Sequence, residues 1–535
     1  MGGRRQSNAV RAGARTKLLR VAVAAGAAAA AVTAGIGASS AGAASRVDRV
    51  DRVHRTAATR TFVVADTSSV EKLDPDVVTN FLDFQALGLI YQQLVQYNAK
   101  LQLKPELATS WSYSDGNKVL TFQLRKGVRF DDGEPFNAAD VVASIDRALT
   151  PKTADASASF LSSVKKVVAT GTYAVEFELS HPDNSILTGL TSVNFSMLPE
   201  AGIKAGNLAT EPDGTGPFEF SSWSPNNSFV VKRNPHYWGG KVTLASVKIE
   251  TVPTEQSIAS ALEANTAQLG LLTTPQVVDG LPSGLTRHKV LGLAYRALML
   301  QDEHGPLANV DNRRAISCAI TRHQVLQDAV FGDGRPVGPV PIGAFASKPV
   351  SVVCPTQNLK KAKAYLKKAG DPHGFTFSAI ASDAEDPTDS AQATVVQSEL
   401  SQAGIKMNVQ NLAGTAYVQD WLAGKFQAAF AENGANPSPY VMYGRYFGAG
   451  GNLAVPAGYH SSTLQKLLAK GDAASTTAQQ KPIWKKLSAT LTTQAVWVWL
   501  FSAYNYAVTT SGVHGFQFEP TTTTSLIGLR TTKLS

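Results

Sequence analysis

The side chains that could catalyse a reaction or hold a metal are scattered along this sequence. None of its nine histidines stands three or four residues from another, so no two share a helix face as zinc ligands do. The chain also lacks H-E-x-x-H, G-x-S-x-G, G-x-x-x-x-G-K-[ST] and G-x-G-x-x-G, the patterns of zinc proteases, serine hydrolases, P-loops and dinucleotide sites. We therefore expect no catalytic residue, no metal site and no cofactor.

Two short segments resemble binding loops but have simpler interpretations. Asp131 and Asp132 stand before Gly133, between a predicted strand and a predicted helix, which is typical of a reverse turn rather than of an acid pair or a calcium site. The glycine-rich segment FGAGGN from Phe447 lacks the strand-turn-helix context of a phosphate cradle, so we expect a flexible loop. Basic residues do not alternate with aromatic ones, which argues against nucleic-acid binding.

The formal net charge of +9 comes mostly from the N-terminal end of the chain. Six basic residues and no acidic ones lie in the first twenty positions, and an uncharged stretch rich in Ala, Gly and Val runs from Val21 to Ser45. With the cleavage-like triplet Ala41-Gly42-Ala43, this pattern predicts an export signal over residues 1–43. The alternative is a membrane anchor that is retained, although alanine and glycine are weakly apolar for a span.

Two further predictions follow from export of the chain, one for the residues after the signal and one for the cysteines. Residues 44–60 have no sustained apolar face and are predicted to be a flexible tether. No cysteine lies near the apolar stretch, so lipid attachment to an N-terminal cysteine is excluded. Cys318 and Cys354 are the only cysteines, and an oxidising compartment allows them to form a disulfide. Two separate buried thiols are the alternative.

The rest of the chain alternates between strand and helix patterns. Apolar residues recur at every second position in VLTFQLR from Val119 and in TYAVEFELS from Thr172, as in half-buried strands. Between these strands, Asn137 is predicted to cap a helix with Asp140 in its first turn. A second helix is predicted from Leu359 to Ala369, ended by Gly370, with its lysines facing water. A composition of 44% hydrophobic and 17% charged residues fits a folded α/β or α+β protein with more than one lobe.

Four longer segments, in the same order and spacing, are similar to those of bacterial extracellular solute-binding proteins of family 5, the dipeptide, oligopeptide and nickel class. The first runs from LVQYN at Leu94 through PELATSWSYSDGNKVLTFQLRKGVRFDDGEPFNAADVVASIDRAL, and the second is DGTGPFEF from Asp213 with FVVKRNPHYWGG. The third is LANVDNRRAISCAITRHQVL from Leu307, and the fourth is LKKAKAYLKKAGDPHGFTF followed by SELSQAGIKMNVQNL.

The resemblance implies an α/β fold of the periplasmic-binding-protein kind, with two lobes joined by a hinge and an extra subdomain inserted in the first lobe. The first lobe is expected at 61–95, 206–285 and 506–535, the inserted subdomain at 96–205 and the second lobe at 286–505. Such proteins bind a solute by lobe closure and deliver it to the permease and ATPase subunits of an ABC importer. We therefore expect an extracytoplasmic, monomeric binding protein and not an enzyme.

The resemblance also identifies candidate ligand-binding residues. Peptide-binding members of the family usually have an aspartate in a loop of the second lobe, where this chain has Asn436, and a neutral amide cannot form a charge-assisted bond with an ammonium group. Glu432 could compensate, or the ligand could lack a free amino group. The candidates from the matching loop are Glu432, Asn433, Asn436, Tyr440 and Tyr443, with Asn80, Arg296 and Gln301 as further candidates at the lobe edges.

Three alternatives remain beside a peptide or peptide-like solute. The same fold could bind a sugar, an opine-like molecule or a metal chelate, because a fold does not determine its ligand. The protein could also be a surface sensor or interaction protein without a transporter. A secreted hydrolase would need a nucleophile and a base that meet in the cleft, and the sequence shows no such pair.

Overall fold

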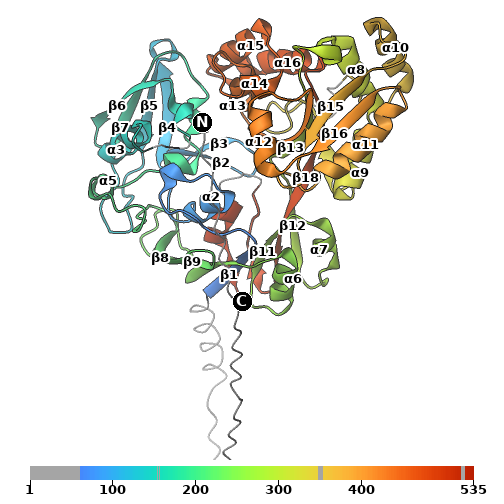
Figure 1. Cartoon of the computed structure of the whole chain (residues 1–535). Coiled ribbons are helices and arrows are strands. Elements are labelled where there is room, and N and C mark those ends of the chain that lie inside the picture. Colours follow the sequence, from blue (N-terminus) through green and yellow to red (C-terminus); the bar gives the residue numbers. More distant parts are fainter. Residues whose placement is uncertain (1–60, 154, 156, 348–352, 520–524) are drawn as a thin grey trace, which may run out of the picture. The chain divides into compact units, whose positions relative to one another are not determined.

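The computed structural model describes residues 61–535, apart from residues 154, 156, 348–352 and 520–524. The predicted export signal and the predicted tether lie outside the described residues. None of the described helices is long and apolar enough to cross a membrane. The described chain folds into two α/β lobes with a smaller antiparallel sheet inserted in the first, as predicted (Figure 1).

The first lobe is organised around strand β1 (Thr61–Asp66). This strand lies parallel to both β10 and β11, so its apolar residues Phe62 and Val64 are completely buried. The lobe also contains β8 (Phe218–Ser224), β9 (Ser228–Arg233), β10 (Ser246–Thr251), β11 (Leu269–Leu272), β12 (Thr286–Leu291), α2 (Phe81–Leu87), α6 (Glu255–Glu263), α7 (Pro275–Gly280), a separate two-stranded sheet of β19 (Val513–His514) and β20 (Lys533–Leu534), and 3₁₀ turns at Pro75–Val77 and Ser525–Thr531.

The inserted subdomain is a four-stranded antiparallel sheet in the order β4-β5-β7-β6, covered by helix α3. The predicted alternation is confirmed, because Leu120, Phe122, Val175 and Phe177 are all completely buried. Its elements are β2 (Val95–Tyr97), β3 (Leu103–Pro105), β4 (Ala108–Ser114), β5 (Val119–Leu124), α3 (Ala138–Leu149), β6 (Val164–Gly171), β7 (Ala174–Leu179), α4 (Ile186–Gly189), α5 (Glu200–Ala205), and 3₁₀ turns at Asp115–Asn117, Ala158–Leu161 and Val193–Phe195.

Helix α3 begins with the predicted cap. The Asn137 side chain accepts a hydrogen bond from Ala139 N at 2.8 Å, and the Asp140 carboxylate accepts one from Asn137 N at 2.9 Å. These bonds satisfy backbone donors at the start of the helix that would otherwise have no partner. Val141 and Ile145 are then buried against the sheet.

The second lobe is built on the strand order β16-β15-β17-β13-β18. Helices α9 and α11 lie beside this sheet in Figure 1. The lobe contains β13 (Ala294–Leu300), α8 (Val310–Ala319), α9 (Arg322–Val330), β14 (Gly334–Pro336), α10 (Leu359–Ala369), β15 (Thr376–Ala381), α11 (Asp389–Ser401), β16 (Lys406–Asn411), α12 (Gly414–Leu422), β17 (Ala428–Gly434), α13 (Pro439–Phe447), α14 (Ala454–Ala457), α15 (Ser462–Asp472), α16 (Thr477–Thr493), the first half of β18 (Trp497–Thr509), and a 3₁₀ turn at Gly305–Ala308.

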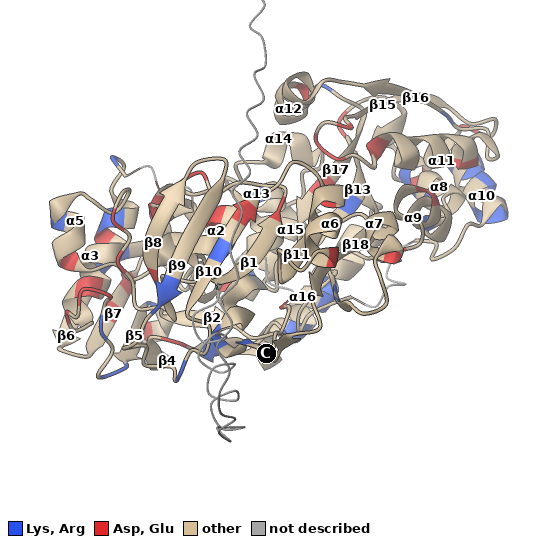
Figure 2. Cartoon of the chain, turned by 90° about the horizontal axis from the view of Figure 1, so that it is seen from below, with Lys and Arg blue, Asp and Glu red and all other residues tan. Residues whose placement is uncertain are grey.

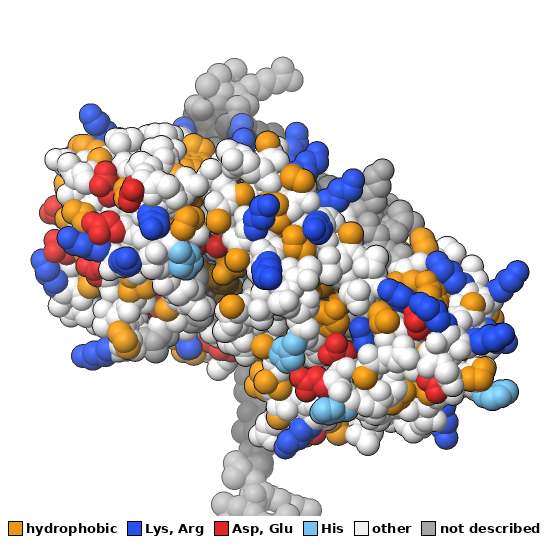
Figure 3. Space-filling view, turned by 90° about the horizontal axis from the view of Figure 1, so that it is seen from above, with side chains coloured by type: hydrophobic (Ala, Val, Ile, Leu, Met, Phe, Trp, Pro, Cys, Tyr) orange, Lys and Arg blue, Asp and Glu red, His pale blue; other side chains and the backbone are white. Residues whose placement is uncertain are grey.

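Helix α10 has the predicted bounds and the predicted faces. Ala362 and Leu366 are completely buried, and Gly370 ends the helix with a φ of 91°, which favours glycine. The lysines of α10 are all exposed, and Figure 2 marks their positions in blue on the helix ribbon. On the face of the molecule in Figure 3, basic and acidic side chains are interspersed in small groups rather than gathered by sign.

Strand β18 connects the two lobes. Its first half pairs with β13, with Trp497 opposite Met299, and its second half pairs with β11 and β12, with Tyr504 opposite Leu291. Because β12 pairs with the second half of β18, we propose that the chain crosses between the lobes at about residues 291–294 and 501–504. The lobe boundaries at 286 and 505 stay a prediction.

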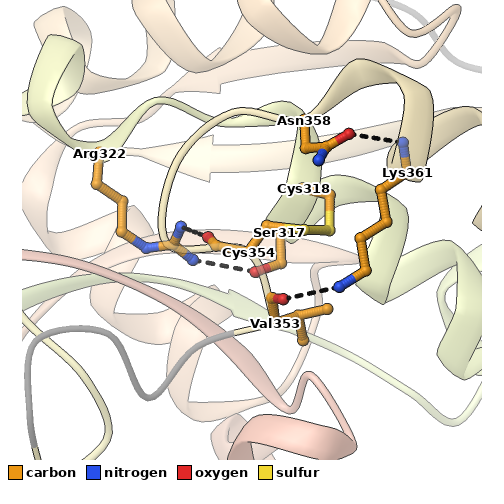
Figure 4. Close-up of a disulfide and its surroundings, with 7 residues drawn as sticks. All are labelled: Ser317, Cys318, Arg322, Val353, Cys354, Asn358 and Lys361. Atoms are coloured by element: carbon orange, nitrogen blue, oxygen red, sulfur yellow. Dashed lines mark hydrogen bonds between the residues drawn. A yellow bond between two sulfur atoms is a disulfide. The ribbon is translucent and has the colours of Figure 1, made fainter.

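The two cysteines are joined in the structure (Figure 4). The disulfide connects Cys318 of α8 to Cys354, with a Cα–Cα distance of 4.8 Å. Beside it lies the fully buried Arg322, whose guanidinium donates to Trp499 O at 2.7 Å, to Cys354 O at 2.9 Å and to Ser317 Oγ at 3.0 Å. Burial without a carboxylate in contact lowers the pKa of Arg322 to about 10. The disulfide and Arg322 together hold the segment around Cys354 against the core of the second lobe.

Candidate functional site

The carboxyl ends of three strands of the second lobe meet at one edge of its sheet. Strand β15 is parallel to both β16 and β17, and β13 is antiparallel to β17, with Ala294 opposite Gly434. The start of β13 therefore lies at this edge, directly after the chain crosses between the lobes. Ligands of α/β proteins bind outside the carboxyl ends of strands, where loops and side chains project from the sheet. We call this edge of the sheet, where the carboxyl ends of β15, β16 and β17 meet the start of β13, the hinge edge, and we expect a ligand to bind there.

A group of three charged side chains lies at the hinge edge. Arg296 of β13 contacts Asp386 through Nε at 2.8 Å and Glu432 through a terminal nitrogen at 2.6 Å. Arg296 and Glu432 are opposite each other on β13 and β17, whereas Asp386 comes from the loop after β15. We call Arg296, Asp386 and Glu432 the hinge-edge triad. One arginine faces two carboxylates, so the triad has an excess negative charge when both are ionised.

The two carboxylates of the triad differ in exposure. Asp386 has only 2% of its side chain exposed, and its second oxygen accepts bonds from Thr388 N at 2.9 Å and Thr388 Oγ1 at 2.7 Å. Glu432 keeps 38% of its side chain exposed. Both carboxylate oxygens of Asp386 thus already accept hydrogen bonds from the protein, whereas the Glu432 carboxylate can contact a molecule at the hinge edge.

The surrounding protein changes the pKa values of this group. Removal of water raises the pKa of Glu432, and Arg296 opposes that change by favouring the ionised form. Burial raises the pKa of Asp389, the first residue of α11, to about 7. Burial alone would lower the pKa of Arg296, but Glu432 and Asp386 reverse the effect and raise it, so Arg296 stays charged.

Asn436 and Tyr440 are both half-buried in the segment that follows β17. Asn436 Oδ1 accepts a hydrogen bond from Ser438 N at 2.9 Å, in the turn that leads into α13. This bond uses the amide oxygen and leaves the amide nitrogen as the donor that Asn436 offers. Burial, and then the charges of Asp472 and Asp183, raise the pKa of Tyr440 to about 12, so its hydroxyl remains protonated at neutral pH.

Asn433 and Tyr443 are buried in the core of the second lobe. Asn433 is 2% exposed and accepts a hydrogen bond from Tyr446, while Tyr443 is completely buried, donates to Pro339 O and accepts from Trp499 Nε1 at 3.0 Å. Asn433 faces the core because alternate residues of β17 point to opposite faces, whereas Tyr443 lies on the buried side of helix α13. We therefore leave both out of the proposed ligand-contacting set.

Asn80 and Gln301 already bind other parts of the protein. Asn80 caps α2 by accepting a bond from Leu82 N at 2.8 Å. The Gln301 side chain donates to Val455 O at 3.2 Å. Of the predicted residues, Glu432 and Arg296 are the two that the structure brings into direct contact.

Sequence reasoning missed Asp386 and Asp389. Both lie in the segment SDAEDPTD from Ser382, which joins β15 to α11. The signal that could have found them is the position of an acidic loop directly after a predicted strand and before a helix, where side chains gather at the carboxyl edge of a sheet.

A separate acidic cavity of about 510 Å³ lies beside Asp131 and Asp213. The predicted reverse turn is confirmed, since Glu134 N donates to Asp132 Oδ1 at 2.8 Å and Gly133 has a φ of 92°. Burial, and then the charge of Asp213, raise the pKa of Asp131 to about 9. Within the described part of the chain, no group of three metal-binding side chains could hold an ion.

A glycine-rich segment follows α13. The predicted FGAGGN loop runs from Phe447 to Asn452, between α13 and α14, and lines a small cavity of about 110 Å³. His460 also lines this cavity, and its Nε2 lies 3.1 Å from a carboxylate oxygen of Glu303. This cavity is too small for a ligand of the size expected at the hinge edge.

The two lobes, the hinge crossing and a charged group at the hinge edge define the class of two-lobed solute-binding proteins. The family model described as "Bacterial extracellular solute-binding proteins, family 5 Middle" matches residues 102–453. The chain belongs to this family of binding proteins, which are not enzymes, and the recognition made from the sequence is confirmed.

Three similar proteins illustrate the range of the family. The "Probable D,D-dipeptide-binding periplasmic protein DdpA" of Escherichia coli K12 is 26% identical over 479 residues, which are 86% of this chain and 91% of that protein. The "Glutathione-binding protein GsiB" of Escherichia coli O6:K15:H31 is 28% identical over 361 residues, which are 66% of this chain and 69% of that protein. The solved structure of DppA from Helicobacter pylori, in complex with the peptide STSA, has a TM-score of 0.69 and 25% identity and covers 89% of this chain and 98% of that one.

Proposed function

We propose that this protein captures a peptide or peptide-like solute with a cationic group outside the cytoplasm and delivers it to an ABC importer. The observation on which this rests is the hinge-edge triad, in which Glu432 is exposed and shares its arginine with a second carboxylate. An ammonium group placed beside Glu432 would balance the excess charge through a charge-assisted hydrogen bond.

Glu432 takes the role that the family usually gives to the position of Asn436. Both residues flank the end of β17, one on the strand and one in the segment after it. Asn436 can still contribute its amide hydrogens, and Tyr440 its protonated hydroxyl and aromatic ring, to the same ligand. The relatives support a peptide-like cargo, because DdpA is described as D,D-dipeptide-binding and DppA was solved with a peptide.

The mechanism is capture by closure. The lobes rotate about the two crossings, a solute at the hinge edge is enclosed, and the closed form is the one that the permease binds. Exclusion of water strengthens each polar contact, so a few of them can provide about 8 kcal/mol, which corresponds to micromolar affinity. The protein is expected to act as a monomer, exported through its predicted signal.

Native mass spectrometry of the full chain, purified from the cells that express it, identifies the cargo. We expect a small molecule of peptide mass to be released on partial unfolding. A sugar or metal-chelate mass would favour the non-peptide alternative. An empty protein with no thermal shift from peptides, sugars or metal chelates would favour a sensor without transport.

The role of Glu432 is tested with Glu432→Gln, which keeps the size of the side chain and removes its charge. Loss of a charge-assisted bond of about 1.5 to 3 kcal/mol should weaken binding of a free-amino peptide roughly 10- to 100-fold in calorimetry. Glu263→Gln, at an exposed position on α6, is the control and should bind as the wild type does. Unchanged affinity in Glu432→Gln would overturn the assignment.

A second variant tests whether the neutral amide of Asn436 faces the amino group of the ligand. Asn436→Asp keeps an oxygen for the bond to Ser438 N and adds a further carboxylate to the site. Affinity for a free-amino peptide should rise about tenfold, whereas affinity for its N-acetylated form should not, since only the first carries the charge. Equal effects on both peptides would show that Asn436 does not face the amino group.

A further inference from the structure

The inserted subdomain and the second lobe are also joined by hydrogen bonds outside the hinge crossings. Ser185 N donates to Asp472 Oδ1 at 2.9 Å, and Asn184 N donates to Asp472 O at 3.0 Å. Asp472 is the last residue of α15 in the second lobe, whereas Asn184 and Ser185 stand just before α4 in the subdomain. Rotation about the hinge would separate these partners.

This contact contains two buried carboxyl groups. Asp183 and Asp472 are 5% and 4% exposed. Asp183 is bound within the subdomain, where Ser185 Oγ donates to it at 2.7 Å and Ile186 N at 3.1 Å. The Asp472 side chain instead receives a bond across the contact and is acted on by the charge of Asp183.

Among the described residues, no Lys or Arg side chain forms an ion pair with Asp183 or Asp472. Tyr113 of β4 donates a hydrogen bond to Asp183 O at 3.0 Å. The charges of Asp472 and Asp183 also act on Tyr440 of α13, after burial, to raise its pKa. Both tyrosines have a raised pKa and stay uncharged near neutral pH. The lysines of the neighbouring helices are exposed to solvent, namely Lys466 and Lys470 of α15 and Lys481, Lys485 and Lys486 of α16.

An apolar contact accompanies the pair. Leu101, in the turn between β2 and β3 of the subdomain, packs against the core cluster of the second lobe that includes Trp484 and Trp497. The subdomain therefore touches the second lobe at Leu101 as well as at Asp472.

We propose that Asp472 and Asp183 form a proton-dependent latch that holds the inserted subdomain against the second lobe. In the latched state, Asp472 is protonated and can donate to Asp183 while its other oxygen accepts from Ser185 N. When the lobes separate, the Asp472 carboxyl group meets water and ionises. Formation of the latch therefore takes up one proton, and acid favours the closed form.

The direction of the pH effect follows from the two states of Asp472. Burial, and then the charge of Asp183, raise its pKa to about 8 in the latch, against about 4 for an aspartate in water. Between these values the closed-to-open ratio should fall as pH rises, by at most about tenfold per pH unit. The latch rests on the lobe closure of the proposed function but not on the identity of the cargo.

Electron spin resonance distances between two labels test the latch in the ligand-free full chain. The labels are placed at Lys166→Cys of the subdomain and Lys363→Cys of α10, both exposed, since the native cysteines are joined in a disulfide. The share of the short distance should fall between pH 6 and pH 9. Asp472→Asn mimics the protonated acid, so it should stay closed at every pH.

Asp472→Ala separates a latch from a merely structural aspartate. It removes the acceptor for Ser185 N and should open the lobes at every pH, the opposite of Asp472→Asn. Asp279→Asn, at an exposed position on α7, is the control and should follow the wild type. Equal distances at all pH values, or the same pH response in Asp472→Asn, would overturn the latch. Capture of a solute in native mass spectrometry is scored separately, so failure of the latch and failure of the proposed function remain distinguishable.

Discussion

At the scale of single residues, Arg296 organises the site. It connects β13 to β17 through Glu432 and to the loop after β15 through Asp386, so three elements depend on one guanidinium. Because Asp386 is only 2% exposed, its charge relies on that contact and on the two bonds from Thr388. The same arginine therefore stabilises the edge of the sheet and positions Glu432 for a ligand.

Arg296→Gln should destabilise the protein. It leaves a buried carboxylate without its cation, which costs about 3 kcal/mol. The measurement is the midpoint of urea unfolding, with Arg296→Lys as the control that keeps a charge and should lose less. If Arg296→Gln unfolded at the wild-type midpoint, Asp386 would not depend on Arg296 for its stability.

At the scale of elements, the disulfide ties α8 to the segment before α10. The two cysteines are 36 positions apart, and the loop that they close limits the freedom of the unfolded chain. Arg322 holds the same segment by its bond to Cys354 O. The sequence left pairing and separate thiols open, and the structure shows the pair.

Loss of this disulfide should lower stability by about 3 to 4 kcal/mol for a loop of this length. The test compares urea midpoints of the wild type and of the double variant Cys318→Ala and Cys354→Ala, each with and without reductant. Reductant should move the wild type towards the variant and leave the variant unchanged. Identical midpoints for both proteins would contradict a stabilising role.

At the scale of the whole molecule, several buried carboxyl groups influence stability together. Burial is the largest cause in each case, and it raises the pKa of Glu106 and Asp389 to about 7 and of Asp131 to about 9. In the unfolded chain these groups ionise near pH 4. Between pH 4 and pH 9 the folded state therefore holds more protons than the unfolded state, so stability falls as pH rises.

The melting temperature should accordingly be lower at pH 9 than at pH 5, by on the order of 5 °C. Differential scanning calorimetry at pH 5, 6, 7, 8 and 9 gives the profile. Asp131→Asn should reduce the fall in melting temperature between pH 5 and pH 9, because the amide cannot ionise. A melting temperature that rises steadily to pH 9 would show that these carboxyl groups are ionised in the folded protein.

Local patterns in the sequence determined much of the fold. The alternation in the strands around Phe122 and Phe177, the cap at Asn137 and the glycine that ends α10 are all confirmed. Each of these depends on neighbours within a few positions, because side-chain periodicity and capping are local properties. The longer segments identified the family, and with it the two lobes and the class of function.

Contacts between distant elements were decided only by the tertiary structure. Glu432 and Arg296 were predicted separately and meet because β17 pairs with β13, whereas Asp386 joins them from a loop that the sequence did not single out. Tyr443 has the residue type of a cleft wall but is completely buried in the core. Ser185 and Asp472, 287 positions apart, meet between the subdomain and the second lobe. Strand order and register set these contacts, and a local pattern shows which face of an element is apolar but not which distant element covers it.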